Sequence, residues 1–175
     1  MTSAGTRAAS FPPALGPRTR LLILGSLPGQ VSLARRQYYA HPQNQFWRLL
    51  GAVLGVDLAG LPYDARLAAL AGAGIGLWDV VGSAVRLGSL DSAIRDPAPN
   101  DLAGLVAALP GLAAIAFNGA AALKIGARQL GNTAIPLVAL PSSSPAYAAM
   151  TFAEKRNAWL TLRRFLPAFS ALPPH

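Results

Sequence analysis

The chain has 175 residues, of which 15 are Lys or Arg and 7 are Asp or Glu, giving a formal net charge of +8. This length fits one domain with a sizeable core, and 53% hydrophobic with 13% charged residues is typical of an α/β domain with buried strands. The absence of cysteine excludes disulfides, thiolate zinc sites and cysteine nucleophiles, and no apolar run approaches the length of about 18 residues that indicates a membrane span.

The excess of basic residues favours a polyanionic partner. Thirteen of the fifteen cationic side chains are Arg, which pairs with phosphate in bidentate geometry, so nucleic acid is the expected partner. The alternative is a generically basic surface that results from an Arg-rich and Ala-rich composition. The lack of cysteine is also compatible with a reducing compartment, and we expect a cytoplasmic location.

The first half of the chain predicts two strands and two helices. Residues 1–20 hold prolines, arginines and small residues without a period, and we expect a disordered basic tail there. The apolar run 21–24 ends in a Gly/Pro turn, which predicts a buried strand. Helical spacing predicts helices over 45–54 and 63–71, and a second strand over 74–78 leads into Asp79.

The second half continues the alternation. A helix is expected from 100–101 to 109, a strand over 113–117, a helix to about 128, a strand over 135–140 and a final helix over 152–165. Thr151 and Glu154 have the spacing of a capping box. Strands that alternate with helices predict a parallel sheet covered on both faces, in a single domain over 21–168 with a short tail over 169–175.

Four loops that follow these strands carry the polar residues. Their sequences are GSLPG at 25–29, YYAHPQNQFW at 38–47, AFNG at 116–119 and LPSSSPAYA at 140–148. Together they resemble the uracil-DNA glycosylase superfamily on its mismatch-specific and thymine-DNA glycosylase side, and most of all its DNA-deoxyinosine (hypoxanthine-DNA) glycosylase branch. The resemblance covers 21–166 and implies a three-layer α/β/α sandwich with a four-stranded parallel sheet, which agrees with the strand count from hydrophobic pattern.

The resemblance implies a monofunctional DNA glycosylase that hydrolyses the N-glycosidic bond of a deaminated base, foremost hypoxanthine, and leaves an abasic site. Such an enzyme flips the nucleotide out of the DNA and needs an aromatic platform, polar groups on the base edge and close backbone contact with phosphate. It requires no metal or cofactor. We expect it to act as a monomer on double-stranded or single-stranded DNA and not at a membrane.

The GSLPG turn is the first expected base-binding element, because its glycines let the backbone approach a ligand closely. An ordinary strand-to-loop turn is the alternative. In the related mismatch-specific enzymes the third residue is an Asn that positions water, whereas this chain has Leu27, and this departure points to the deoxyinosine branch. The expected base-binding residues of this turn are Gly25, Ser26, Leu27, Pro28 and Gly29.

Two further residues are expected to contact the base. Tyr39 matches the aromatic stacking residue of the family, and base–aromatic stacking contributes about 1–3 kcal/mol per base. Tyr38 is the alternative platform, and packing beneath the loop is the alternative role for both. Asn118 suits a tight turn with positive φ, and the family match places it on the ligand side.

Three polar side chains are the catalytic candidates. Asn44 can orient water or read a purine edge, and it can also cap the following helix. Asp79 follows a predicted strand and either activates water or bonds loop amides. His41 is expected to orient its loop rather than act as a general acid. Asp91 and Asp96 are interpreted as solvated loop acids.

The LPSSSPAYA loop resembles the second superfamily motif, which enters the minor groove and grips phosphates. Hydroxyls and exposed amides suit such contacts, and the wedge that fills the emptied stack is Tyr147, or Ala146 with its neighbours. Arg156, with Lys155, Arg163 and Arg164, either extends the phosphate track or forms a solvated face. The expected DNA-binding residues are Ser142, Ser143, Ser144, Pro145, Ala146, Tyr147 and Arg156.

Three alternative functions stay open from the sequence: a glycosylase for uracil or xanthine, an inactive DNA-binding module of the same fold, and a nucleosidase for free nucleosides. The high positive charge argues against the nucleosidase. A lyase activity is not expected, because the two lysines, Lys124 and Lys155, lie outside the predicted active-site loops.

Overall fold

The computed structural model describes residues 7–167. Its centre is a four-stranded parallel sheet in the order β3-β2-β6-β7, so the predicted fold class is confirmed. The central strand β2 is buried along its whole length, as its unbroken apolar sequence predicts. The strands are β2 (Leu21–Gly25), β3 (Ile75–Asp79), β6 (Ala114–Asn118) and β7 (Leu137–Leu140).

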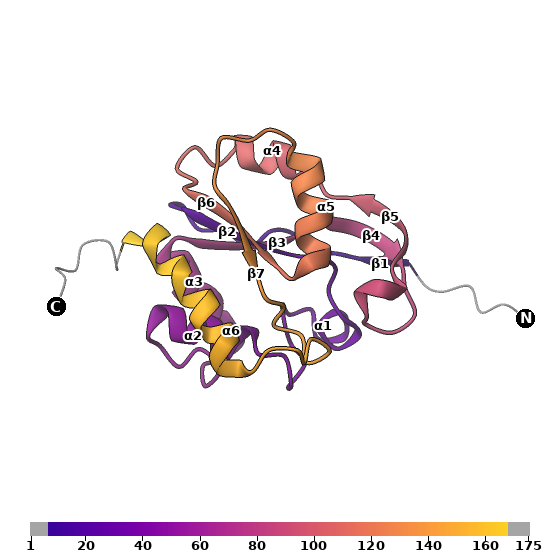
Figure 1. The fold of residues 1–175 in the computed structure, drawn as a ribbon, viewed down its shortest axis with the longest axis horizontal. Coiled ribbons are helices and arrows are strands. Elements are labelled where there is room, and N and C mark those ends of the chain that lie inside the picture. Colours follow the sequence, from indigo (N-terminus) through magenta and orange to yellow (C-terminus); the bar gives the residue numbers. More distant parts are fainter. Residues whose placement is uncertain (1–6, 168–175) are drawn as a thin grey trace, which may run out of the picture.

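Helices cover both faces of this sheet (Figure 1). Successive side chains of β2 point to opposite faces of the sheet, so Leu21 and Ile23 pack in one apolar cluster while Leu22 and Leu24 pack in the other. The first cluster includes residues of α2, α3 and α6, and the second includes residues of α4 and α5. The helices are α1 (Gln30–Arg35), α2 (Phe46–Leu54), α3 (Tyr63–Ala73), α4 (Leu102–Ala107), α5 (Ala120–Leu130) and α6 (Phe152–Leu160).

The helix ends follow the sequence signals in part. The capping box is present, because Glu154 N donates to Thr151 Oγ1 at 3.2 Å and Thr151 N donates to Glu154 Oε2 at 2.6 Å. The predicted single helix over 152–165 is instead α6 followed by the 3-10 helix η2 (Thr161–Phe165). Among residues 7–167, no helix has both the length and the apolar character needed to cross a membrane.

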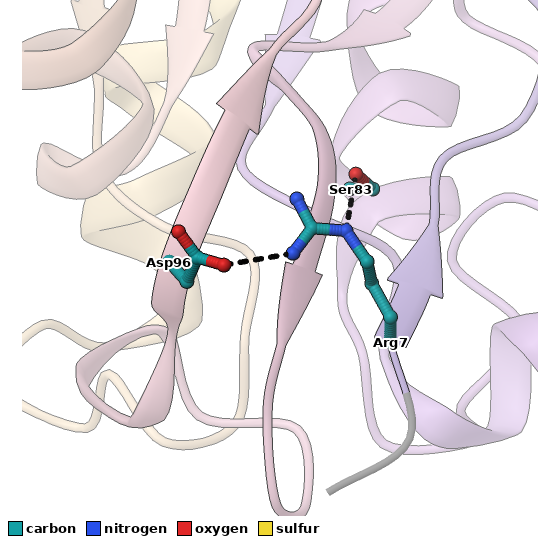
Figure 2. A network of polar contacts seen from close by, with 3 residues as sticks. All are labelled: Arg7, Ser83 and Asp96. Atoms are coloured by element: carbon teal, nitrogen blue, oxygen red, sulfur yellow. Dashed lines mark hydrogen bonds and ion pairs between the residues drawn. The ribbon is translucent and has the colours of Figure 1, made fainter.

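A second, antiparallel sheet was not predicted. Its order is β1-β4-β5, formed by β1 (Arg7–Ala9), β4 (Val81–Val85) and β5 (Arg95–Pro99). Arg7 donates across it to Ser83 at 2.9 Å and to the Asp96 carboxylate at 3.2 Å, so that one guanidinium contacts all three strands (Figure 2). Two prolines in β5 concealed the strand in the sequence, and the structure places it at the edge of the sheet, where proline is tolerated.

The prediction of a disordered tail over 1–20 is wrong for residues 7–20. Beyond β1, Ala14 pairs with Leu77 of the edge strand β3, and Phe11 O accepts from Trp78 Nε1 at 2.9 Å. The Phe11 ring also meets Tyr38 edge-on, with centroids 5.2 Å apart. The segment is ordered because it pairs with the free edge of β3 and packs its apolar residues there. Prolines interrupt the hydrophobic pattern of the segment, so the sequence did not show this. Residues 1–6 of this predicted tail and the predicted tail over 169–175 lie outside the described residues.

Candidate active site

A cavity of about 520 Å³ opens at the carboxyl ends of β2, β3 and β6, where parallel α/β sheets bind ligands. Figure 1 shows α1, the loop after β7 and the connection between β4 and β5 gathered at this side of the sheet. Of the predicted site residues, only Arg156 does not line the cavity. Those that do are Gly25, Ser26, Leu27, Pro28, Gly29, Tyr39, His41, Asn44, Asp79, Asn118, Ser142, Ser143, Ser144, Pro145, Ala146 and Tyr147.

Asp79 is the buried acid of this cavity. The register pairs it with Gly25, and a Cβ built on Gly25 would lie 2.6 Å from Asp79 Oδ1, so only glycine leaves room for the carboxylate. Asp79 is 3% exposed and its Oδ2 has no hydrogen-bond partner. The predicted alternative, bonding to loop amides, therefore does not apply to Oδ2. The pKa of this carboxyl is raised to about 7, first by burial and then by Asp91, against the lowering effect of Arg86.

Tyr39 combines a stacked ring with a buried hydroxyl. Its ring lies on Phe46 with centroids 3.7 Å apart and planes 11° apart, so one face is covered and a base can stack only on the other. Its backbone has φ of +53°, which is strained for a tyrosine. The buried hydroxyl has no hydrogen-bond partner of normal geometry. Burial and the nearby Asp79 carboxylate raise the pKa of Tyr39, with a lowering effect from Asn118, so the hydroxyl remains protonated.

The alternative platform, Tyr38, has a structural role. Its side chain is 5% exposed, and its hydroxyl donates to Pro12 O at 3.1 Å. Its carbonyl accepts from Trp47 Nε1 at 3.2 Å. These contacts tie Tyr38 to the N-terminal segment and to α2, so Tyr39 is the better candidate for base stacking.

Asn44 and His41 shape the entry to α2. Asn44 Oδ1 accepts from Phe46 N at 2.9 Å, which satisfies one of the amides at the helix start. Within residues 7–167 no hydrogen bond uses Asn44 Nδ2, so the amide donor remains for a ligand. The N-cap residue of α2 is Gln45, and Asn44 binds Phe46 N from the position before it. His41 is exposed and its Nδ1 accepts from Gln43 N at 3.1 Å, which is the geometry of a loop-orienting residue.

Asn118 and Ser143 lock the DNA-binding loop to the sheet. Asn118 Nδ2 donates to Ser143 Oγ at 2.8 Å, Ser143 N donates to Asn118 Oδ1 at 2.9 Å, and Ser143 O accepts from Gln45 N at 3.0 Å. Ser143 is 1% exposed, so the predicted phosphate contact is wrong for its side chain. Asn118 lines the cavity, but both ends of its amide are occupied by the loop. Its local role is to position that loop.

In the rest of the loop, serine hydroxyls and a carbonyl accept hydrogen bonds from backbone amides of the loop itself. Ser142 Oγ accepts from Ser144 N at 3.1 Å, and Ser144 Oγ accepts from Ala146 N at 3.2 Å. Tyr147 N donates to Ser144 O at 3.1 Å. These amides therefore already have partners within the loop, because short local hydrogen bonds satisfy them. The hydroxyls of Ser142 and Ser144 are the groups left to meet phosphate.

Lys155 lies beneath this loop, although the sequence placed it outside the site. It is 2% exposed, and its Nζ donates to Gln45 Oε1 at 3.1 Å and to Ser144 O at 3.4 Å. Nζ also lies 5.3 Å from the Tyr147 ring centroid. Burial lowers the pKa of Lys155. In contrast, the neighbouring Arg156 is exposed and lines a separate hollow beside Trp47.

Three residues from the connection between β4 and β5 also shape the site. Asp91, interpreted from sequence as a solvated acid, lines the cavity and accepts from Ser26 Oγ at 2.5 Å. Arg86 is 6% exposed and its guanidinium donates to the carbonyls of Leu27 and Pro28. Ser89 Oγ accepts from Gln30 N at 2.9 Å. No motif or period marks these residues, because the second sheet alone brings them to the GSLPG turn.

Comparison with known proteins agrees with this geometry. The sequence model of the uracil DNA glycosylase superfamily matches residues 12–163. The chain is 48% identical over 109 residues to a hypoxanthine DNA glycosylase of Methanosarcina barkeri (strain Fusaro / DSM 804), covering 62% of this chain and 69% of the relative. A hypoxanthine DNA glycosylase of Methanosarcina acetivorans is 46% identical with the same coverage.

A solved structure shares the fold. The solution NMR structure of a candidate uracil DNA glycosylase from Methanosarcina acetivorans superposes with a TM-score of 0.79 at 37% sequence identity. The match covers 91% of this chain and 99% of that one. With the family match spanning most of the sequence, including all four loops of the cavity, the chain belongs to the uracil DNA glycosylase superfamily.

Proposed function

We propose that this chain is a monofunctional DNA glycosylase that hydrolyses the N-glycosidic bond of hypoxanthine in DNA and leaves an abasic site. The observation that carries the proposal is a single cavity at the carboxyl edge of the sheet that combines an aromatic platform, a partnerless buried carboxylate and an amide donor. The basic charge of +8 supports DNA as the substrate. The two similar hypoxanthine DNA glycosylases support the choice of base.

Each part of the cavity has a role in such a reaction. The extruded base stacks on the free face of Tyr39, which is fixed from behind by Phe46. The ionised Asp79 carboxylate accepts a proton from the attacking water or a hydrogen bond from an N–H of the base, and both contacts require the deprotonated acid. Asn44 Nδ2 donates to the substrate from the mouth of the cavity, while Leu27 closes it with an apolar wall. The chain's own residues supply all of these groups.

The proposed enzyme works as a monomer in the cytoplasm on DNA that contains a deaminated base. The test is a panel of duplexes that carry one deoxyinosine, deoxyuridine or deoxyxanthosine, incubated with the protein and cleaved with alkali. We expect the deoxyinosine strand to be cut fastest. Faster cutting at deoxyuridine or deoxyxanthosine would change the base, whereas tight binding without base release would indicate an inactive DNA-binding module. Faster release from free deoxyinosine than from DNA would indicate a nucleosidase.

A further inference from the structure

The connection between β4 and β5 exposes two leucines at its tip. Leu87 is 68% and Leu90 is 56% exposed, the highest values among the large hydrophobic side chains of residues 7–167. Between them Gly88 has φ of +75°, and a Cβ there would meet no atom within 4 Å, so the turn projects into open space. Leu87 and Leu90 are three positions apart at one turn and leave more than half of their surface in water, which is unfavourable and indicates a contact surface.

The tip is held by contacts on both sides. Arg86 Nε donates to Gly88 O at 3.1 Å while its other nitrogens reach the carbonyls of the GSLPG turn. Ser89 and Asp91 hold α1 and Ser26 respectively. The strands on either side belong to the sheet that Arg7 crosses in Figure 2. The leucines are therefore presented from a fixed position and do not hang from a free loop.

The tip borders the cavity. Leu90, Ser89 and Asp91 line one side, while Ala146 and Tyr147 of the DNA-binding loop also line it from a different part of the chain. Tyr147 is 40% exposed, so the rim of one cavity carries a large apolar side chain from each of two separate loops. A nucleotide that enters the cavity must leave its helix beside both loops.

We propose that the tip 87–90 is a second DNA-contacting element, in which Leu90 enters the base stack of duplex DNA beside the extruded nucleotide and Leu87 packs against the adjoining sugar–phosphate surface. Apolar side chains inserted between base steps are a known means of unstacking DNA. The partner is double-stranded DNA, because a single strand has no continuous duplex stack to keep open. The inference rests on the proposed glycosylase function and extends it to how the base is extruded.

The experiment compares Leu90→Ser and the double variant Leu87→Ser/Leu90→Ser with the wild type. Single-turnover excision is measured on one deoxyinosine strand, free and annealed to its complement. Because the leucines would no longer help to unstack the duplex, we expect at least a roughly tenfold slower excision from the duplex. Excision from the single strand should fall less than excision from the duplex, because no duplex stack has to be opened there.

The control variant is Leu15→Ser. Leu15 is 37% exposed and contacts Gly76 near the start of β3, away from the cavity end of that strand. It should keep wild-type rates on both substrates. Fluorescence of 2-aminopurine opposite or beside deoxyinosine reports extrusion directly, and the leucine variants should show a smaller increase on binding than the wild type.

Equal losses on both substrates would overturn the inference, because the tip would then support the cavity rather than the extrusion step. No loss on either substrate would overturn it as well. Sedimentation of the free protein tests whether the leucines instead form a dimer interface. A wild-type dimer that the leucine substitutions dissociate would overturn the inference and assign the surface to a second copy of the chain. A wild type that releases no base from either DNA would refute the proposed function itself, and the inference with it.

Discussion

The raised pKa of Asp79 leads to a prediction about stability as well as catalysis. The folded-state pKa of about 7 lies above the ordinary value of 3.8. Folding therefore favours the protonated carboxyl, and the ionised carboxylate destabilises the folded protein. This cost is absent at pH values below 3.8, grows as the pH rises between the two values, and is complete above about 7. The variant Asp79→Asn removes the ionisable group and keeps the size of the side chain.

The two pKa values set the size of the effect. Their separation corresponds to about 4 kcal/mol at alkaline pH. Between about pH 5 and about pH 8.5 the wild type should lose on the order of 3 kcal/mol relative to Asp79→Asn. Urea unfolding of both proteins at these two pH values measures the difference. Asp64→Asn is the control, because Asp64 is an exposed acid at the start of α3, outside the cavity.

Ionisation of Asp79 should raise the excision rate, whereas it lowers the stability of the folded protein. Because the deprotonated carboxylate is the reactive form, the single-turnover rate of the wild type should rise with pH through about 7 and then level off. Asp79→Asn should be slow at every pH while being more stable at alkaline pH. A stability difference that is the same at both pH values would refute the desolvation of Asp79. A variant with wild-type rates would refute its place at the reaction.

Substitutions at four further residues test the remaining roles. Tyr39→Ala should cut excision sharply and Tyr39→Phe should keep most of it, whereas equal large losses would show that the hydroxyl matters more than stacking. Leu27→Asn should create or raise uracil excision, and a folded variant without change on a uracil duplex would show that the cavity shape selects the base. Asn44→Ala should lower single-turnover excision at least roughly tenfold with DNA affinity nearly unchanged, and Asn44→Asp should also be impaired although it caps the helix. If Asn44→Asp works normally while Asn44→Ala only melts earlier, Asn44 is a cap alone. Lys155→Met should lower the melting temperature, because the oxygens of Gln45 and Ser144 lose the amine that donates hydrogen bonds to them; an unchanged melting temperature would contradict this.

The prediction of no lyase activity gains a direct test from the same lysine. Lys155 Nζ lies under the DNA-binding loop, but Lys155 does not line the cavity and its amine is held by Gln45 and Ser144. Borohydride should therefore trap no covalent DNA adduct with the wild type. An adduct that disappears in Lys155→Met would show that this amine reaches the sugar.

Local patterns in the sequence determined the central sheet and its loops. The apolar run of β2, the turn that follows it and the capping box at Thr151 each depend on residues within a few positions of one another, so the chain order shows them. Because parallel strands place their carboxyl ends at one edge, the same patterns also predicted which loops meet. The cavity brings together every predicted site residue apart from Arg156.

Contacts between distant segments decided the rest. The pairing of Gly25 with Asp79 buries the carboxylate and so raises its pKa, and no local pattern encodes that register. The order of residues 7–20, the β1-β4-β5 sheet and the burial of Lys155 likewise arise from partners about 60 to 110 positions away. Burial and long-range hydrogen bonds depend on the whole fold. The sequence made Asp79 a catalytic candidate, and the tertiary structure adds that its Oδ2 is buried without a hydrogen-bond partner.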